Sequence, residues 1–324
     1  MKVALTGTAG HLGSNLIPVL ISRGHSVKAL IRGGSLEGAP VETVTGSVLD
    51  VDSLSRLMNG CDALIHCAAV ISVNGDPAGI VHQTNVEGTR LVMDAAKKVG
   101  VKRVIHISSI HAHEQAPDRE LLDETRKLVS EKSFAYDRSK RAGQEIALSF
   151  NSDGMEVLVM NPTSIIGPYD TKPSRMGKVI IDLHRGKLPF VFSGGFDFCD
   201  GRDVAIAIVN GLNMGRAGEN YLLGGKWHSF GQVSEYIGLA AGKKIKPFSL
   251  PVFIGTLGLP VVHLMGWINK SEPLYTNEAL VAIAEGNRCI SSEKAKKGLG
   301  YSIRPFEETI RDTICWYKQN GYLV

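Results

Sequence analysis

The sequence has few cysteines, and their spacing excludes two classes of protein. Five cysteines are scattered along 324 residues, and no C-x-x-C pair occurs. Structural zinc sites and disulfide-rich secreted folds both need closely and regularly spaced cysteines. We therefore expect five reduced thiols, which is typical of a cytoplasmic protein.

A signal peptide and a convincing membrane span are also missing. The first β-type residues begin at Lys2, so no secretory leader is expected. The one membrane-like stretch, residues 251–268, contains no Lys, Arg, Asp or Glu and just reaches the length of a span. Because three glycines and Pro260 interrupt it, we expect two short core or lid helices there and no membrane contact.

The sequence has no long block of charge of one sign. Lys and Arg number 36 against 32 Asp and Glu, which gives a net charge of +4. A dedicated nucleic-acid binder concentrates its basic residues, so this class is not expected. A mildly basic chain suits small anionic ligands, and its length suits one large domain or two closely joined ones.

The sequence does contain a strand, a glycine turn and a helix at its start. Apolar β-type residues at 2–6 lead into Gly7, Gly10 and Gly13, and a helix-compatible segment follows at 16–21. This arrangement aims backbone N–H groups and the positive end of a helix at a pyrophosphate. Glycines at these positions permit the turn, the approach of a phosphate and close packing of helix on strand. An ordinary strand–helix turn is the alternative.

Strand-like and helix-like segments then alternate through the first half of the chain. The expected strands are residues 27–31, 41–44, 63–66, 101–108 and 157–160, and the expected helices are residues 53–59, 79–99 and 136–150. This alternation predicts an α/β fold with a doubly wound parallel sheet of the Rossmann type. We expect a dinucleotide-binding domain at 1–161 with returns near 202–212 and 221–223. Residues 162–324 are expected to form mainly a smaller, interleaved C-terminal substrate lobe and closing helices.

A tyrosine and a lysine provide a second signal. Tyr136 and Lys140 are four residues apart in an expected helix, so their side chains share one face. A nearby positive charge favours the phenolate and lowers a tyrosine pKa that begins near 10. The pair therefore predicts a general acid/base, and a solvated helix face is the alternative.

Six motifs occur in order along the chain. They are Thr6–Gly13 (TGTAGHLG), His66–Ala69 (HCAA), Asn85–Thr89 (NVEGT), Ile107–Ser109 (ISS), the Tyr136 and Lys140 pair, and Asn161–Pro168 (NPTSIIGP). With these motifs the chain resembles an extended short-chain dehydrogenase/reductase of the NAD-dependent epimerase/dehydratase superfamily. It is most similar to the branch of dihydroflavonol-4-reductase-like and 3β-hydroxysteroid dehydrogenase-like enzymes.

The resemblance implies a catalytic site and its substrate contacts. Tyr136 would act as the general acid or base, Lys140 would hold the nicotinamide ribose, and Ser109 would hydrogen-bond the reacting oxygen. Substrate contacts are expected from Ser109 and Tyr136, and from His111 and Tyr169 in the loops. No metal is expected, because the two histidines near the serine lack a third spaced ligand and the chemistry that the resemblance implies needs none.

The resemblance also implies a nicotinamide dinucleotide at the switch point of the sheet. The residues expected to bind it are Gly7, Gly10, His11, Leu12, Gly13, Arg32, Ser47, Val48, Cys67, Ala68, Ala69, Asn85, Ile107, Tyr136, Lys140, Pro162, Thr163 and Ile165. Ser47 departs from the family, which commonly has Asp beside the adenine.

The end of the second expected strand predicts which dinucleotide is used. An acidic residue there accepts a hydrogen bond from the ribose 2′-hydroxyl of NAD, whereas an arginine suits the 2′-phosphate of NADP. Ile31 occupies the acidic position and Arg32 follows. We therefore expect NADP(H) to be preferred over NAD(H).

Three function classes follow. The favoured one is NADP(H)-dependent reduction of a small ketone or aldehyde, or oxidation of the alcohol, because the lobe is largely apolar. A nucleotide-sugar epimerase or dehydratase with tightly bound NAD is the alternative, since Arg175, Lys178 and Arg202 offer charge for a diphosphate. A non-catalytic NAD(P)-binding regulator is the third. The expected helices 79–99 and 136–150 would serve a homodimer.

Overall fold

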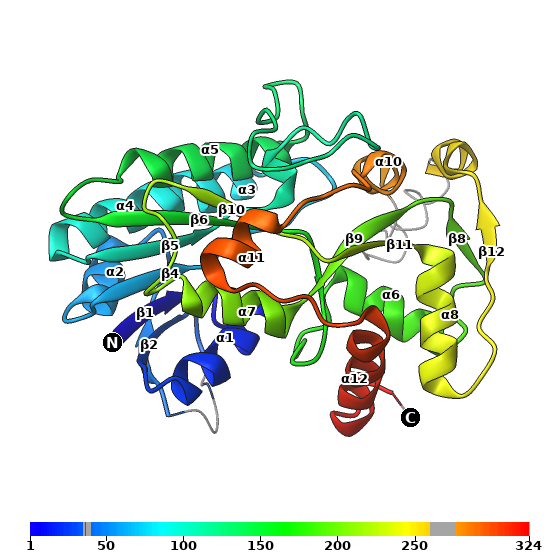
Figure 1. Ribbon diagram of the computed structural model, residues 1–324, viewed down its shortest axis with the longest axis horizontal. Coiled ribbons are helices and arrows are strands. Elements are labelled where there is room, and N and C mark those ends of the chain that lie inside the picture. The colour runs from blue at the N-terminus through cyan, green and yellow to red at the C-terminus, as the bar shows by residue number, and fades with distance from the viewer. Residues whose placement is uncertain (35, 37–39, 260–275, 324) are drawn as a thin grey trace.

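A parallel sheet forms the centre of the molecule (Figure 1). The computed structural model describes residues 1–34, 36, 40–259 and 276–323, and in this part of the chain the sheet has seven strands in the order β10-β6-β5-β4-β1-β2-β3. The strands are β1 (Lys2–Thr6), β2 (Ser26–Ile31), β3 (Glu42–Thr45), β4 (Ala63–His66), β5 (Arg103–Ile107), β6 (Glu156–Pro162) and β10 (Asn220–Leu223). Neighbouring strands are parallel throughout, so the predicted doubly wound α/β fold is confirmed.

Helices cover both faces of this sheet. On one face lie α1 (His11–Ser22), α7 (Gly201–Asn210) and α11 (Glu293–Leu299). On the other face lie α2 (Val51–Met58), α4 (Gly88–Val99) and α5 (Ala135–Ser149). Strands buried on both sides need apolar residues at successive positions, which is why β1 contains Val3–Leu5 and β4 contains Ala63–Ile65.

The helix expected over residues 79–99 is divided into three segments. A short α3 (Ile80–His82) leads into a π-helical turn, η1 (Gln83–Glu87), and α4 follows. Insertions of this kind are frequent at functional sites. Asn85, which the sequence predicts to bind the dinucleotide, lies within this turn.

A second lobe lies beside the carboxyl ends of the strands (Figure 1). It contains a three-stranded sheet of β7 (Ser164–Ile166), β9 (Gly195–Asp200) and β11 (Lys226–Ser229), and a pair of β8 (Phe190–Phe192) with β12 (Phe248–Leu250). Around them lie α6 (Arg175–His184), α8 (Phe230–Ala241), α10 (Asn277–Glu285) and α12 (Phe306–Gln319). The sequence-based division at residue 161 stays a prediction, although β10 pairs with β6 and α7 packs on α1.

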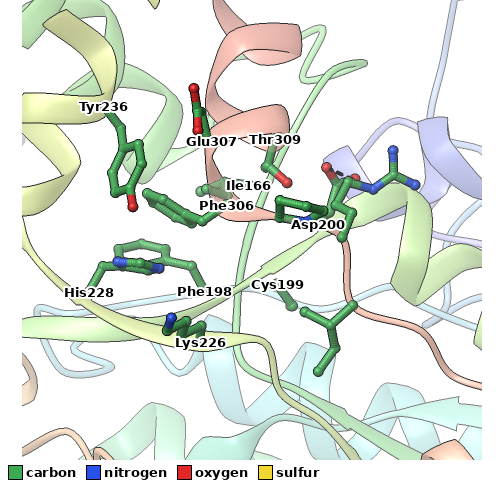
Figure 2. Close-up of a pocket in the computed structure, with 13 residues that line it drawn as sticks. Ile166, Phe198, Cys199, Asp200, Lys226, His228, Tyr236, Phe306, Glu307 and Thr309 are labelled. Carbon is green, nitrogen blue, oxygen red and sulfur yellow. Dashed lines mark ion pairs between the residues drawn. The ribbon is translucent and has the colours of Figure 1, made fainter. Parts of the chain in front are cut away.

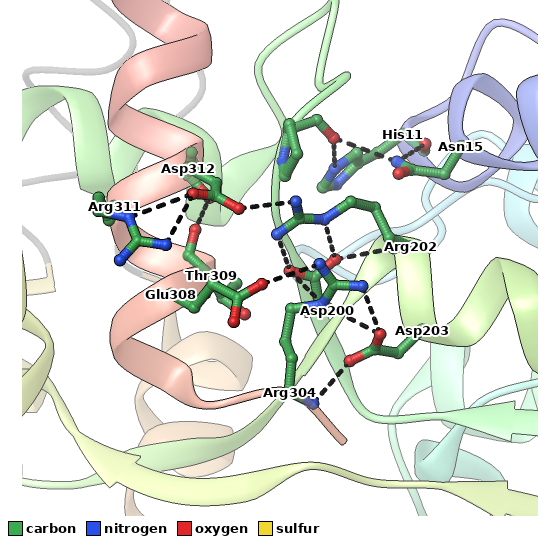
Figure 3. Close-up of polar contacts among 12 residues, drawn as sticks. His11, Asn15, Asp200, Arg202, Asp203, Arg304, Glu308, Thr309, Arg311 and Asp312 are labelled. Carbon is green, nitrogen blue, oxygen red and sulfur yellow. Dashed lines mark hydrogen bonds and ion pairs between the residues drawn. The ribbon is translucent and has the colours of Figure 1, made fainter. Parts of the chain in front are cut away.

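Ion pairs fix α12 to the elements that begin near residue 200 (Figure 3). Arg202 bonds Asp312 of α12 at 2.7 Å and Asp200 at 2.8 Å. Arg304, just before α12, bonds the buried Asp203 at 2.6 Å. Because a buried carboxylate without its partner costs about 3–5 kcal/mol, these contacts hold the second lobe together.

The membrane-like stretch falls only partly within the described structure. Residues 252–259 form a helix, and residues 260–268 lie outside the described residues. Among the residues that the structure describes, no helix combines the length and the apolarity needed to cross a bilayer.

Candidate active site

The glycine turn after β1 forms a cradle that admits no side chains. Gly7 has a φ of 76°, and a Cβ on it would lie 2.6 Å from the carbonyl carbon of Cys67. A Cβ on Gly13 would lie 2.3 Å from the oxygen of Gly7. Gly10 precedes α1 without a side-chain cap, and the first turn of α1 has no acidic residue. The N–H groups at this helix start therefore suit the pyrophosphate of a dinucleotide.

The start of α1 also contacts the second lobe (Figure 3). The Nε2 atom of His11 lies 3.0 Å from the carbonyl oxygen of Pro168, and Asn15 donates to the same oxygen at 3.2 Å. Leu12, between them, is buried in the main core. His11 and Leu12 lie in the first turn of α1, beside the glycine turn. His11 connects this turn to the loop after β7.

The residues predicted to contact the adenosine half of the dinucleotide lie at the carboxyl ends of β2 and β3. Arg32 follows Ile31 of β2 and is exposed, and no hydrogen bond or ion pair joins it to another described residue. Ser47 and the buried Val48 follow β3, and the Ser47 hydroxyl accepts a hydrogen bond from the N–H of Leu49. A free guanidinium is therefore available where the sequence predicts a 2′-phosphate.

The loop after β4 is held in place by Asn85. Its side chain accepts from the N–H of Val70 at 2.7 Å, donates to the Val70 oxygen at 2.9 Å, and donates to the Ser139 hydroxyl of α5 at 2.9 Å. The loop includes Cys67, Ala68 and Ala69, which the sequence predicts to pass beneath the dinucleotide. These contacts make Asn85 a positioning residue for the loop, and its direct contact with the dinucleotide stays a prediction.

Ser109 and Tyr136 meet at the carboxyl end of β5. Ser109 precedes a 3₁₀ turn, η2 (Ile110–Ala112), and its hydroxyl accepts from the N–H of His111 at 3.2 Å. Burial raises the pKa of Tyr136 to about 12, against the opposing effect of a hydrogen bond with the Ser109 hydroxyl. The lowered pKa expected from the sequence is therefore wrong for the protein alone, because burial raises the pKa of Tyr136 more than Ser109 lowers it.

Lys140 lies one turn beyond Tyr136 in α5 and is buried. Its ammonium donates to the carbonyl oxygen of Ile107 at 2.8 Å, and burial lowers its pKa to about 8. Burial and the Lys140 charge lower the pKa of the neighbouring His66 to about 3, so that imidazole is neutral. No described carboxylate pairs with Lys140, so its charge is available to stabilise hydroxyls placed beside it.

Cys67 lies near Lys140 but is not a reactive thiol. Burial raises the pKa of Cys67 to about 12, against the opposing effect of the Lys140 charge. A thiol becomes nucleophilic only as the thiolate. Cys67 therefore acts as a small apolar side chain.

Of the loop residues predicted to contact substrate, His111 is the one that lies beside Tyr136 in the structure. Its Nδ1 atom lies 3.1 Å from the Asp137 carboxylate, and its ring meets the Tyr136 ring edge-on with centroids 5.9 Å apart. Tyr169 instead has a φ of 66° and lies 6.3 Å from the Trp316 ring of α12. No contact among the described residues joins Tyr169 to Tyr136, so its substrate contact stays a prediction.

The remaining predicted contacts lie where β6 ends and β7 begins. Pro162 closes β6, Thr163 donates from its N–H to the oxygen of Leu223 at 3.2 Å, and Ile165 lies in β7. Among the described residues, no group of three His, Cys, Asp or Glu side chains is arranged to hold a metal. The sequence predicts no metal, and the site chemistry needs none.

Asn161 is a positioning residue whose role the sequence does not reveal. It is fully buried at the end of β6, where its amide donates to the Ser109 oxygen at 2.9 Å and to the Gln144 side chain at 2.7 Å. It therefore fixes the backbone that carries Ser109 against α5. The motif Asn161–Pro168 marked the position, but only the adjacency of β5 and β6 gives the contact.

Replacing Asn161 by Leu is expected to lower both stability and turnover. The change leaves the Ser109 oxygen and the Gln144 amide oxygen without their donor, at about 1–3 kcal/mol of unfolding free energy. Movement of Ser109 should lower kcat about tenfold or more. Urea unfolding and kcat would be compared with those of Asn213→Leu, an exposed asparagine. An unchanged kcat in Asn161→Leu would contradict the positioning role.

A cavity of about 370 Å³ lies elsewhere, between α12, β9 and β11 (Figure 2). It is lined by residues that include Phe198, His228, Tyr236 and Phe306. None of the residues predicted to bind dinucleotide or substrate lines it. This cavity is therefore separate from the candidate active site around Tyr136.

Known proteins resemble the whole chain. It is 28% identical to "Sterol demethylase protein B" of Methylococcus capsulatus, over 100% of both chains. It is 29% identical to a "Putative dihydroflavonol 4-reductase" of Synechocystis, over 98% of this chain and 95% of that one. The crystal structure of gox2253 matches with a TM-score of 0.84 and 32% identity, over 100% and 99% of the two chains.

The model of the NAD dependent epimerase/dehydratase family matches residues 3–224. The chain therefore belongs to the NAD dependent epimerase/dehydratase family.

Proposed function

We propose that this protein reduces a ketone or aldehyde carbonyl with NADP(H), or oxidises the corresponding alcohol. The observation that carries the proposal is the convergence of Ser109, Tyr136 and the buried Lys140 at the carboxyl end of β5, with the pKa of Tyr136 raised to about 12. At neutral pH the phenol keeps its proton, which is the form that a carbonyl oxygen needs from a general acid.

The bound nicotinamide supplies the hydride in this reaction. Tyr136 donates its proton to the substrate oxygen, and the Ser109 hydroxyl donates a hydrogen bond to the same atom. A lost donor of this kind typically costs about 2.7–4 kcal/mol of transition-state stabilisation. The ammonium of Lys140, bonded to Ile107 beneath α5, orients the ribose hydroxyls and favours the phenolate left after transfer.

Arg32 supports NADP(H) as the dinucleotide. It is exposed after β2, no carboxylate stands at the end of that strand, and Arg32 has no described partner to displace. A guanidinium makes strong charge-assisted hydrogen bonds to phosphate.

An apolar carbonyl compound is the substrate class that we favour. Two of the relatives are named as a sterol demethylase protein and a putative dihydroflavonol reductase, which supports a flat or polycyclic compound. Arg202, a candidate for binding a diphosphate, is already bonded to Asp200 and Asp312. The intact set of Ser109, Tyr136 and Lys140 favours an enzyme over a regulator without catalysis.

A nucleotide-sugar epimerase or dehydratase is the second candidate. The family description names these activities, and Lys178 is exposed on α6 of the second lobe. Such an enzyme regenerates its dinucleotide within one turnover. NAD that stays bound through purification would therefore identify an enzyme of this kind.

Mass spectrometry of the purified protein, followed by titration with NADPH and NADH, tests the proposal. We expect no retained dinucleotide, and reversible NADPH binding at least tenfold tighter than that of NADH, as one phosphate contact would give. NAD that copurifies in a one-to-one ratio would replace the proposal by the second candidate. Absence of binding to either dinucleotide would favour a protein without this chemistry.

A further inference from the structure

The helix at residues 252–259 exposes apolar side chains on its outer face. Phe253 and Leu257, four residues apart, are 64% and 76% exposed. The inner face packs closely on the second lobe, since a Cβ on Gly255 would lie 2.7 Å from the Phe192 ring. Both faces of this helix are therefore apolar, a pattern that is normally buried.

The exposed apolar surface continues along one edge of the second lobe. Phe248 of β12 is 78% exposed, and Leu239 near the end of α8 is 70% exposed. Figure 1 shows α8, β12 and the helix that follows β12 along the edge that faces away from the seven-stranded sheet. The chain between α8 and β12 runs along this edge and carries Lys243, Lys244 and Lys246.

From residue 236 to residue 271 the chain carries basic and no acidic residues, although the exposed Glu235 of α8 lies one turn before Leu239. Lys243, Lys244 and Lys246 fall in this interval and are exposed. Exposed phenylalanine and leucine beside an excess of lysines match the apolar boundary and the negative headgroups of an anionic bilayer.

A second copy of the chain fits this edge less well. A two-fold symmetric contact places the same patch of both subunits face to face. The lysines of one copy would then meet those of the other, and no carboxylate of the 236–271 interval is present to compensate. Charge complementarity therefore favours an anionic lipid surface over self-association.

We propose that this edge, the interfacial edge, docks the protein on anionic membranes. It is defined by Leu239, Lys243, Lys244, Lys246, Phe248, Phe253 and Leu257. The phenylalanines and leucines enter the headgroup region, and Lys244 and Lys246 contact the lipid phosphates, without any helix crossing the bilayer. The Lys243 ammonium stays bonded to the carbonyl oxygen of His184. The sequence predicts no membrane contact for residues 251–268, because glycines and Pro260 interrupt that stretch, and it does not reveal which of its side chains face outward. The proposal does not depend on the reaction that the protein catalyses.

Cosedimentation of the full chain with lipid vesicles tests the interfacial edge. The protein is expected to bind vesicles of phosphatidylcholine with phosphatidylglycerol and not vesicles of phosphatidylcholine alone, and added salt should weaken the binding. The double variant Phe253→Ser, Leu257→Ser should lower partitioning at least tenfold, because both apolar side chains are lost from the headgroup region. Lys244→Gln with Lys246→Gln should lower it roughly thirtyfold, because two charge contacts with the lipid are lost.

Matched variants control for general effects of these changes. Leu121→Ser removes another leucine that is 64% exposed, and Lys98→Gln removes an exposed lysine of α4. Neither should alter partitioning, and unchanged thermal unfolding of all variants would show that they fold. Absence of binding, or equal binding to both kinds of vesicle, would overturn the proposal. A wild-type dimer that dissociates in Phe253→Ser, Leu257→Ser would instead assign the edge to a second copy and overturn it as well.

Discussion

Replacing Tyr136 by Phe is expected to lower kcat by about 10²–10⁴ while leaving the Kd for NADPH within about twofold. The ring remains in the first turn of α5, and only the hydroxyl that meets Ser109 is lost. Kinetics with a carbonyl substrate and fluorescence titration with NADPH would measure the two effects separately.

Tyr236→Phe is the matched control for this change. Tyr236 lines the separate cavity beside Phe306, and no contact among the described residues joins it to Ser109, Tyr136 or Lys140. Removing the Tyr236 hydroxyl should leave kcat unchanged. If Tyr136→Phe weakened NADPH binding as much as it slowed turnover, Tyr136 would be a structural residue and the proposed acid would be wrong.

Replacing Arg32 by Asp is expected to exchange the preference for NADPH for a preference for NADH. The change removes the guanidinium that would bond the 2′-phosphate and places a carboxylate near that phosphate. Loss of a charge-assisted hydrogen bond costs about 1.5–3 kcal/mol, and repulsion adds to it, so NADPH affinity should fall on the order of a hundredfold. NADH affinity should stay equal or rise, because the new carboxylate accepts from the 2′-hydroxyl. Isothermal titration with each dinucleotide would measure both.

Arg56→Asp provides the same change of net charge at another exposed arginine, on α2. It should leave the ratio of the two affinities as it is in the wild type. An unchanged ratio in Arg32→Asp would remove the basis for NADP(H).

The central sheet could be predicted closely because its strands are buried on both faces. Residues 63–66 read as a continuous apolar run, and β4 has these same bounds. The π-helical turn at η1 could not be predicted in this way, since one inserted residue leaves the apolar pattern of a helix nearly unchanged. Its position follows from packing, with a Cβ on Gly143 of α5 placed only 2.9 Å from the Asn85 oxygen.

The sequence could predict which candidate catalytic residues are neighbours, but it could not predict their electrostatic environment. The spacing of Tyr136 and Lys140 predicts that they are neighbours, which depends on helix geometry alone. The direction of the Tyr136 pKa depends on how much protein covers the phenol, and that protein comes from distant segments. The Asn161 contact with Ser109 likewise joins residues 52 positions apart.

The ion pairs of α12 have a consequence for the order in which the chain folds during synthesis. Asp203 leaves the ribosome 101 residues before Arg304, its partner. At about 5–20 residues per second, that aspartate waits roughly 5–20 s for its counter-charge. During this interval the carboxylate has to stay in water, so α7 cannot settle fully onto the sheet. The nascent face of the central sheet that α7 covers is therefore expected to be a part of this protein that needs protection by chaperones.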